Sequence, residues 1–130
     1  MNNTFNLEVV TPDGKIFSDE AKFAQFPGSE GDLGVLPGHA SLVTLLKAGI
    51  IEITDKNDKK DMVAINWGYL KIDEQKVSVL AEGAVYIGGN SDSVIAVSLQ
   101  RAKDLIKAMA NDSSAYASTV AKLDSFAGIK

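Results

Sequence analysis

Apolar and polar side chains alternate with a period of two from Phe5 to Ile87, and this alternation constrains the fold more than any other feature. In its first segment, Phe5, Leu7 and Val9 are separated by single residues. A period of two is typical of strands that bury one face. A turn follows at residues 12–14, where proline fixes φ and glycine accepts a positive φ. Many short strands joined by short turns indicate an antiparallel β-sandwich or flattened barrel rather than a βαβ fold.

The same alternation predicts about ten strands and identifies the side chains that form the core of the sandwich. Two short strands are expected at 15–17 and 22–26. The polar run at 55–60 is expected to be the tip of a hairpin between strands at 50–54 and 61–66. The predicted core consists of the alternating apolar residues Leu7, Val9, Phe17, Phe26, Leu45, Ile53, Val63, Ile65, Leu70, Ile72, Val77 and Val79.

Beyond residue 88 the period changes to that of an α-helix. A stripe at spacings of three and four consists of Ile95, Leu99, Ala102, Ile106 and Met109. This spacing places the five side chains on one helical face. The polar segment 111–114 can end this helix and cap a second one. The chain is therefore predicted to comprise a β-sandwich domain at 1–88 and a helical hairpin domain at 89–130, with a hinge at 88–93.

Composition restricts the classes of function. A chain of 130 residues with 45% hydrophobic content has room for one core and a small appendage. The net charge of −4 argues against nucleic acid as a partner, because binding phosphates requires a basic surface. The absence of cysteine excludes disulfides and thiol catalysis. No secretory signal and no apolar run near the roughly 20 residues of a membrane span is visible, so any membrane association is expected to be indirect.

The residues predict neither catalysis nor a metal or cofactor site. His39 is the only histidine, and no acid is placed to orient it, so a loop or interface role is expected instead of catalysis. The glycine-rich segment 28–38 lacks the Lys-Ser or Lys-Thr pair of a phosphate-binding loop. The run 55–61 has Lys60 where a calcium loop requires glycine. The chain is therefore expected not to be an enzyme by itself.

The segment 30–41 is the main candidate for a binding site. It combines glycines and a proline with a short apolar insert at 33–36 and acidic residues beside it. An apolar patch rimmed by acids is a form that protein docking sites take. The alternative is a tight connection whose leucines and valine pack into the sandwich. The candidate partner-binding residues are Glu30, Asp32, Leu33, Val35, Leu36, His39 and Ser41.

The sequence GDLGVLPGHA at 31–40 and the sequence NWGYLKI at 66–72, followed by a strand at 76–82, resemble the epsilon subunit family of rotary F-type ATP synthases. The resemblance covers residues 3–87 well and the C-terminal part in outline. It implies a β-sandwich followed by a helical hairpin. It also implies a non-catalytic rotor subunit that links the gamma subunit to the membrane c-ring and couples ion flow to ATP synthesis. The implied location is peripheral, on the cytoplasmic face of a bacterial plasma membrane.

The resemblance also implies roles for particular residues. Asp32 matches the position that faces the c-ring, and His39 lies in the stretch near gamma. Arg101 and Ala102 match the nucleotide-binding motif of bacterial epsilon subunits, but Ser98 stands where the motif has an acid. Arg101 is thus the one candidate nucleotide contact, and no cofactor is expected.

The predicted hairpin is expected to regulate ATP hydrolysis weakly. Its second helix offers only Lys122 and Lys130 for contact with acidic segments of the catalytic subunits. Few positive charges give little electrostatic gain to offset undocking an apolar stripe. The alternative function is a free-standing β-sandwich interaction adaptor whose helices cover its own apolar surface.

Overall fold

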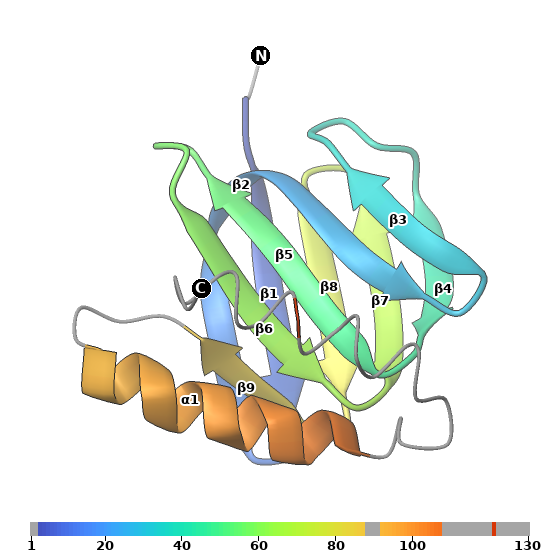
Figure 1. The fold of residues 1–130 in the computed structure, drawn as a ribbon. Helices are drawn as coiled ribbons and strands as arrows, with labels where there is room; N and C mark the ends of the chain where they lie inside the picture. Colours follow the sequence, from blue (N-terminus) through green and yellow to red (C-terminus); the bar gives the residue numbers. More distant parts are fainter. Residues whose placement is uncertain (1–2, 88–91, 108–120, 122–130) are drawn as a thin grey trace.

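A computed structural model describes residues 3–87, 92–107 and 121 of the chain (Figure 1). The strands in these ranges are β1 (Phe5–Thr11), β2 (Gly14–Gly28), β3 (Gly31–Val35), β4 (Leu42–Leu46), β5 (Gly49–Asp55), β6 (Lys60–Ile65), β7 (Gly68–Asp73), β8 (Lys76–Ala81) and β9 (Ala84–Ile87), and the helix is α1 (Asp92–Leu105). The predicted β-sandwich followed by a helix is confirmed. The predicted second helix and most of the predicted hinge lie outside the described residues.

The nine strands form one sheet that closes on itself in the order β1-β8-β7-β4-β2-β5-β6-β9, with β3 beside β2 and a further pairing of β1 with β2. The long strand β2 closes the sheet, because it pairs with strands of both layers. Its first half pairs with β1, and its second half pairs with β3 and touches β4. Register shifts beside Val9 and between Ala21 and Phe23 interrupt these ladders, and such irregularities bend a strand. The prediction of two short strands in this region is therefore wrong, because one bent strand serves both layers.

Ten of the twelve predicted core residues are fully buried, which confirms the alternation as a guide to the inward face. Phe17 is half-buried and packs at the edge of the core against Tyr86, with the ring centroids 5.8 Å apart. The prediction that Leu45 is in the core is wrong, because Leu45 is 49% exposed, whereas its neighbour Leu46 is 3% exposed. Strand β4 has apolar residues on both faces, so alternation alone could not fix which face is inward.

Helix α1 lies along β9 and β6 on the outer side of their layer (Figure 1). Leu99, Ala102 and Ile106 of the predicted stripe are buried there, in a second apolar cluster with residues of β5, β6 and β9. Because α1 covers this layer, Met62–Ile65 is buried on both faces and reads as a continuous apolar run. Within the described part of the chain, no helix has the length and apolar character required to cross a membrane.

Candidate partner-binding site

Five large apolar side chains are exposed on the layer opposite α1, and we call them the apolar face. They are Val43, Leu45, Trp67, Tyr69 and Leu80. Leu45 on β4 pairs with Tyr69 on β7, which in turn pairs with Leu80 on β8. Directly paired residues point to the same side of a sheet, so these three form one row. The row crosses β4, β7 and β8, which lie side by side in Figure 1. The ring of Trp67 packs edge-on against that of Tyr69 at a centroid distance of 6.3 Å.

A cavity of about 430 Å³ adjoins the apolar face at the end of β7 and β8. Its walls are Val10, Thr11, Pro12, Trp67, Tyr69, Leu80, Ala81 and Glu82. Val10 pairs in parallel with Leu80, so the cavity extends the apolar face onto β1. The lining is almost entirely apolar, with a single carboxylate at its rim.

The apolar face departs from what a solvent-facing sheet normally presents. An antiparallel sheet with one solvated face carries polar residues at its outward positions. Here Tyr69 and Leu80 occupy outward positions next to the buried Leu70 and Val79. Contiguous exposed apolar side chains mark interaction sites, and tryptophan and tyrosine are enriched among residues that dominate binding. The arrangement can therefore bind another protein.

The predicted acidic residues lie on the turn between β2 and β3. Glu30 and Asp32 are exposed, and Gln25 donates a hydrogen bond to Asp32 Oδ2 at 3.2 Å. Gly31 has a φ of 127°, and a Cβ added at Gly28 would lie 2.5 Å from the carbonyl oxygen of Gly31. The turn thus requires glycine at both positions, and it presents the two carboxylates to solvent.

The three residues of the predicted apolar insert differ in their burial. Val35 is fully buried in the core and pairs with Ala24, so this side chain follows the packing alternative. Leu33 is half-buried against the same core. Leu36 is 60% exposed at the beginning of the loop between β3 and β4. Of the three, Leu36 alone presents its side chain largely to solvent.

The loop at 36–41 carries the remaining two predicted residues. The backbone N–H of His39 donates to the carbonyl of Leu36 at 3.2 Å, and His39 Nδ1 lies 2.7 Å from the carbonyl oxygen of Ala40. Gly38, with a φ of 83°, makes the turn between them. Ser41 is exposed immediately before β4, the strand that supplies two members of the apolar face. The predicted loop therefore leads directly into the apolar face, which sequence analysis missed.

The β2–β3 turn is also joined to β4. The N–H of Ser29 donates to the carbonyl of Leu45 at 3.0 Å, and the N–H of Lys47 donates to the carbonyl of Pro27 at 2.9 Å. Backbone hydrogen bonds of this kind fix the turn relative to the strand. The acidic turn and the apolar face are consequently parts of one rigid surface.

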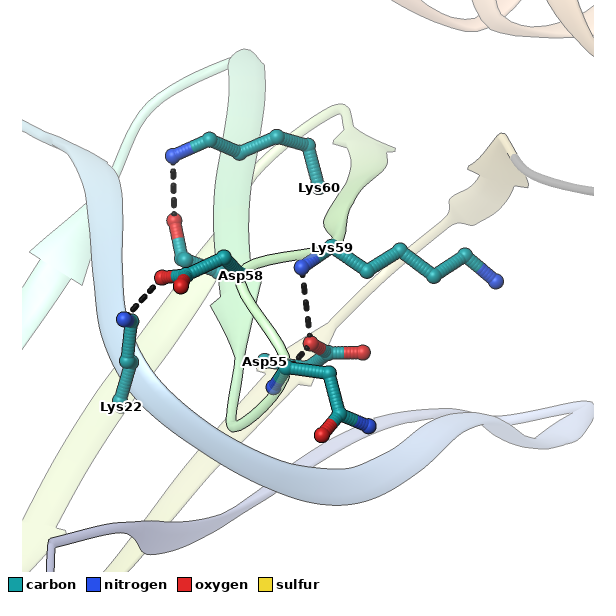
Figure 2. Close-up of polar contacts among 7 residues, drawn as sticks. Lys22, Asp55, Asp58, Lys59 and Lys60 are labelled. Atoms are coloured by element: carbon teal, nitrogen blue, oxygen red, sulfur yellow. Dashed lines mark hydrogen bonds and ion pairs between the residues drawn. The ribbon is translucent and has the colours of Figure 1, made fainter.

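The polar run between β5 and β6 is a hairpin tip, as predicted, and Figure 2 shows its contacts. The backbone N–H groups of Asn57 and Lys59 donate to Asp55 Oδ1 at 2.8 and 2.9 Å. Asp58 forms an ion pair with Lys22 of β2, and the hydrogen bond and charge of Lys22 lower the pKa of Asp58. Because these carboxylates hold the tip together, its charges have a structural role. The described residues contain no group of three or more metal-ligating side chains.

Arg101 lies on the solvent side of α1. Its side chain is exposed, whereas the adjacent Ala102 is fully buried against the sheet. The position leaves the guanidinium accessible to an anion, but a contact with nucleotide stays a prediction.

Comparison with known proteins gives a consistent result. Residues 4–87 match the sequence family described as the ATP synthase delta/epsilon chain, beta-sandwich domain. The chain is 60% identical over 119 residues to the ATP synthase epsilon chain of Campylobacter curvus, and the match covers 92% of each chain. It is 54% identical over 125 residues to the ATP synthase epsilon chain of Campylobacter fetus, covering 96% of this chain and 97% of the relative.

Solved structures have the same fold. A chain in the mitochondrial ATP synthase of Euglena gracilis, solved as the OSCP/F1/c-ring assembly, aligns with a TM-score of 0.63 and 23% identity. The alignment covers 92% of this chain and 74% of that one. A chain in the central stalk/c-ring structure of the Tetrahymena thermophila mitochondrial ATP synthase aligns with a TM-score of 0.51 and 9% identity, covering 61% and 63%.

Proposed function

Because the chain belongs to the ATP synthase delta/epsilon family as an epsilon chain, an accessory and non-catalytic subunit, we propose that its apolar face binds the gamma subunit. We further propose that the acidic β2–β3 turn faces the ring of c subunits. The observation that carries the first proposal is the row of exposed apolar side chains across β4, β7 and β8.

In this role the chain transmits rotation and performs no chemistry. Ion flow turns the c-ring, the ring turns this subunit together with gamma, and ATP is made on the catalytic subunits. A close-packed interior deforms little under load, and the sheet closed through β2 has such an interior. The proposed location is the cytoplasmic face of a bacterial plasma membrane, where the ring would hold the subunit indirectly.

The energetics favour the apolar face over the loop as the main contact with gamma. Complete burial of a large apolar side chain stabilises a complex by about 1.5–3 kcal/mol. Leu80, Val43 and Leu36 are each at least 59% exposed, but Leu36 stands in a loop apart from the row. Val43 and Leu80 are held on strands, so they lose little conformational freedom on binding. His39 and Ser41 are proposed to lie at the edge of this contact.

The direct experiment is a binding titration of the full chain with purified gamma. We expect Leu80→Asp and Tyr69→Asp to weaken binding about 30-fold or more, because a residue central to an interface contributes about 2 kcal/mol or more. Ser18→Asp, at an exposed position of β2 outside the apolar face, is the matched control and should bind normally. Unchanged affinity in both face variants, with the fold intact, would contradict the proposed gamma contact.

The c-ring contact requires a separate test in an assembled synthase. Asp32→Lys reverses the charge of an exposed turn residue without touching the core, so the subunit should fold and bind gamma normally. We expect reduced coupling between ion flow and ATP synthesis in vesicles that contain this variant. Normal coupling would remove Asp32 from the proposed contact.

The sandwich at 1–88 and the helical segment at 89–130 are proposed to act as separate domains. The burial of Leu99, Ala102 and Ile106 supports a helix that stays docked on the sandwich, and regulation through this segment is proposed to be weak. The alternative, a free-standing adaptor, predicts unrelated partners after affinity purification at native levels. The proposed function predicts gamma and the other synthase subunits in the same eluate.

A further inference from the structure

We propose that the docking of α1 and the conformation of the apolar face are coupled through the side chain of Asn66. The proposal deepens the proposed function, on which it rests only for the identity of the partner that the face binds. The two surfaces lie on opposite layers of the sandwich, and Asn66 is in the turn that carries the chain from one layer to the other.

Asn66 ties two layer-crossing turns together. Its Oδ1 accepts hydrogen bonds from the N–H of Trp67 at 2.9 Å and from the N–H of Gly83 at 2.8 Å. Its Nδ2 donates to the carboxylate of Glu82. Two backbone bonds complete the connection, from Asn66 N–H to the Gly83 carbonyl at 3.3 Å and from Glu82 N–H to the Trp67 carbonyl at 3.1 Å. The Trp67 carbonyl is thus held directly by the β8–β9 turn, and its N–H is held indirectly through the side chain of Asn66.

The C-terminal end of α1 packs against this same turn. A Cβ added at Gly83 would lie 3.0 Å from Leu105 Cδ1 and 3.3 Å from Asn66 Nδ2. Gly83 therefore lies between the helix and the asparagine with no room for a side chain. Glu82, the adjacent residue, belongs to the wall of the cavity beside Trp67. One short turn contacts both α1 and the apolar face.

The physical consequence follows from how the asparagine is covered. Leu105 covers Gly83 and holds it against Asn66, and the hydrogen bond from the Gly83 N–H to Asn66 Oδ1 is partly buried there. Removal of this cover frees the turn, and Trp67 loses its fixed orientation at the cavity. Coupling between two sites is reciprocal, so a partner that binds the apolar face also favours the docked helix.

The proposal is tested on the full chain by fluorescence, because Trp67 is the only tryptophan. We expect Leu105→Ala and Asn66→Ala to increase acrylamide quenching of Trp67 and to shift its emission to longer wavelength. Leu99→Ala is the matched control, since it truncates the same helix at a buried position six residues away. It should leave the quenching unchanged while the helical signal in circular dichroism is retained. Unchanged quenching in Leu105→Ala, or an equal change in folded Leu99→Ala, would overturn the proposal.

A rescue pair separates positioning by Asn66 from a general loss of packing. Asn66→Asp keeps the acceptor for both N–H groups but places a carboxylate against that of Glu82. Adding Glu82→Gln restores a donor and acceptor pair with the direction of the bond reversed. We expect the single variant to increase quenching and the double variant to return it to the wild-type level. Equal quenching in both variants would contradict a positioning role.

Binding to gamma supplies the second readout. We expect Leu105→Ala to weaken binding at the apolar face roughly five-fold, the lower end of typical coupling between sites. The loss in the Leu105→Ala, Asn66→Ala double variant should equal that of Asn66→Ala alone, because both act through one path. Additive losses would overturn the coupling. If wild-type chain does not bind gamma, the proposed function fails, and the fluorescence results still decide the coupling.

Discussion

Leu45 and Leu46 are adjacent leucines of β4 with opposite environments, and they allow a sharp test of which side of this strand is the interface. Leu46 is 3% exposed within the core, and Leu45 is 49% exposed on the apolar face. Truncation of each to alanine removes the same atoms. The two variants therefore differ only in where those atoms lie.

The expected magnitudes follow from this burial. Leu46→Ala removes about three buried methylene equivalents at about 0.8 kcal/mol each and leaves a cavity, so we expect a loss of about 3 kcal/mol in the free energy of unfolding. At Leu45 the side chain is half solvated and leaves no cavity. We expect that variant to lose less than about 1 kcal/mol. The order reverses for gamma binding, where Leu45→Ala should be the weaker binder and Leu46→Ala should be near normal while folded.

Urea titration followed by Trp67 fluorescence measures the first quantity, and titration with gamma under native conditions measures the second. A lower midpoint with an unchanged slope identifies a change in stability alone. Comparable destabilisation by the two variants would show that the register of β4 is wrong. Comparable gamma affinity, with both folded, would remove Leu45 from the interface.

Three further perturbations have defined outcomes. Burial and a hydrogen bond to Asp61 raise the pKa of Tyr86 to about 12. The unfolded chain therefore loses the phenolic proton at a lower pH than the folded chain, and the free energy of unfolding should fall as the pH rises from about 10 to 12. Tyr86→Phe should remove that pH dependence in denaturant titrations, and an unchanged slope would contradict the assignment. A Cβ at Gly68 would lie 2.4 Å from the Leu80 carbonyl oxygen, so Gly68→Ala should lower stability by about 1–3 kcal/mol in thermal unfolding, and a neutral result would refute this packing. Deletion of 98–130 in an assembled synthase should change ATP hydrolysis little, whereas a several-fold rise would show strong regulation.

The alternation predicted the strands well where one face is inward and the other polar. In β7, Leu70 and Ile72 are buried between exposed neighbours, and the pattern identifies the inward side directly. The pattern was ambiguous in β4, because its outward residues are also apolar. It could not show that β2 is continuous, since the bend and the partners on either half are set by pairing with strands distant in sequence.

The candidate site was predicted in part for the same reason. Glycine, proline and acidic residues drew attention to the loop at 30–41, and the structure leaves Glu30 and Asp32 exposed. The apolar face was missed, because its residues come from three strands and the β6–β7 turn and adjoin only after the sheet has formed. A sequence signal did exist at Tyr69 and Leu80, which are apolar residues at positions where alternation calls for polar ones. Large apolar residues at the outward positions of paired strands therefore indicate a surface that another element covers: α1 covers Met62 and Ile87, and a partner is proposed to cover Tyr69 and Leu80.

The separation of the two proposed contacts determines how the subunit would carry torque. The acidic turn is joined to β4 by two backbone hydrogen bonds, Ser29 to Leu45 and Lys47 to Pro27. These two bonds flank the antiparallel pair formed by Gly28 and Leu46. Under the proposed function, force from the ring enters at this turn and reaches the gamma-binding row through one strand. The path is short and consists of backbone groups fixed in the sheet, so it can transmit rotation without any change in side-chain conformation.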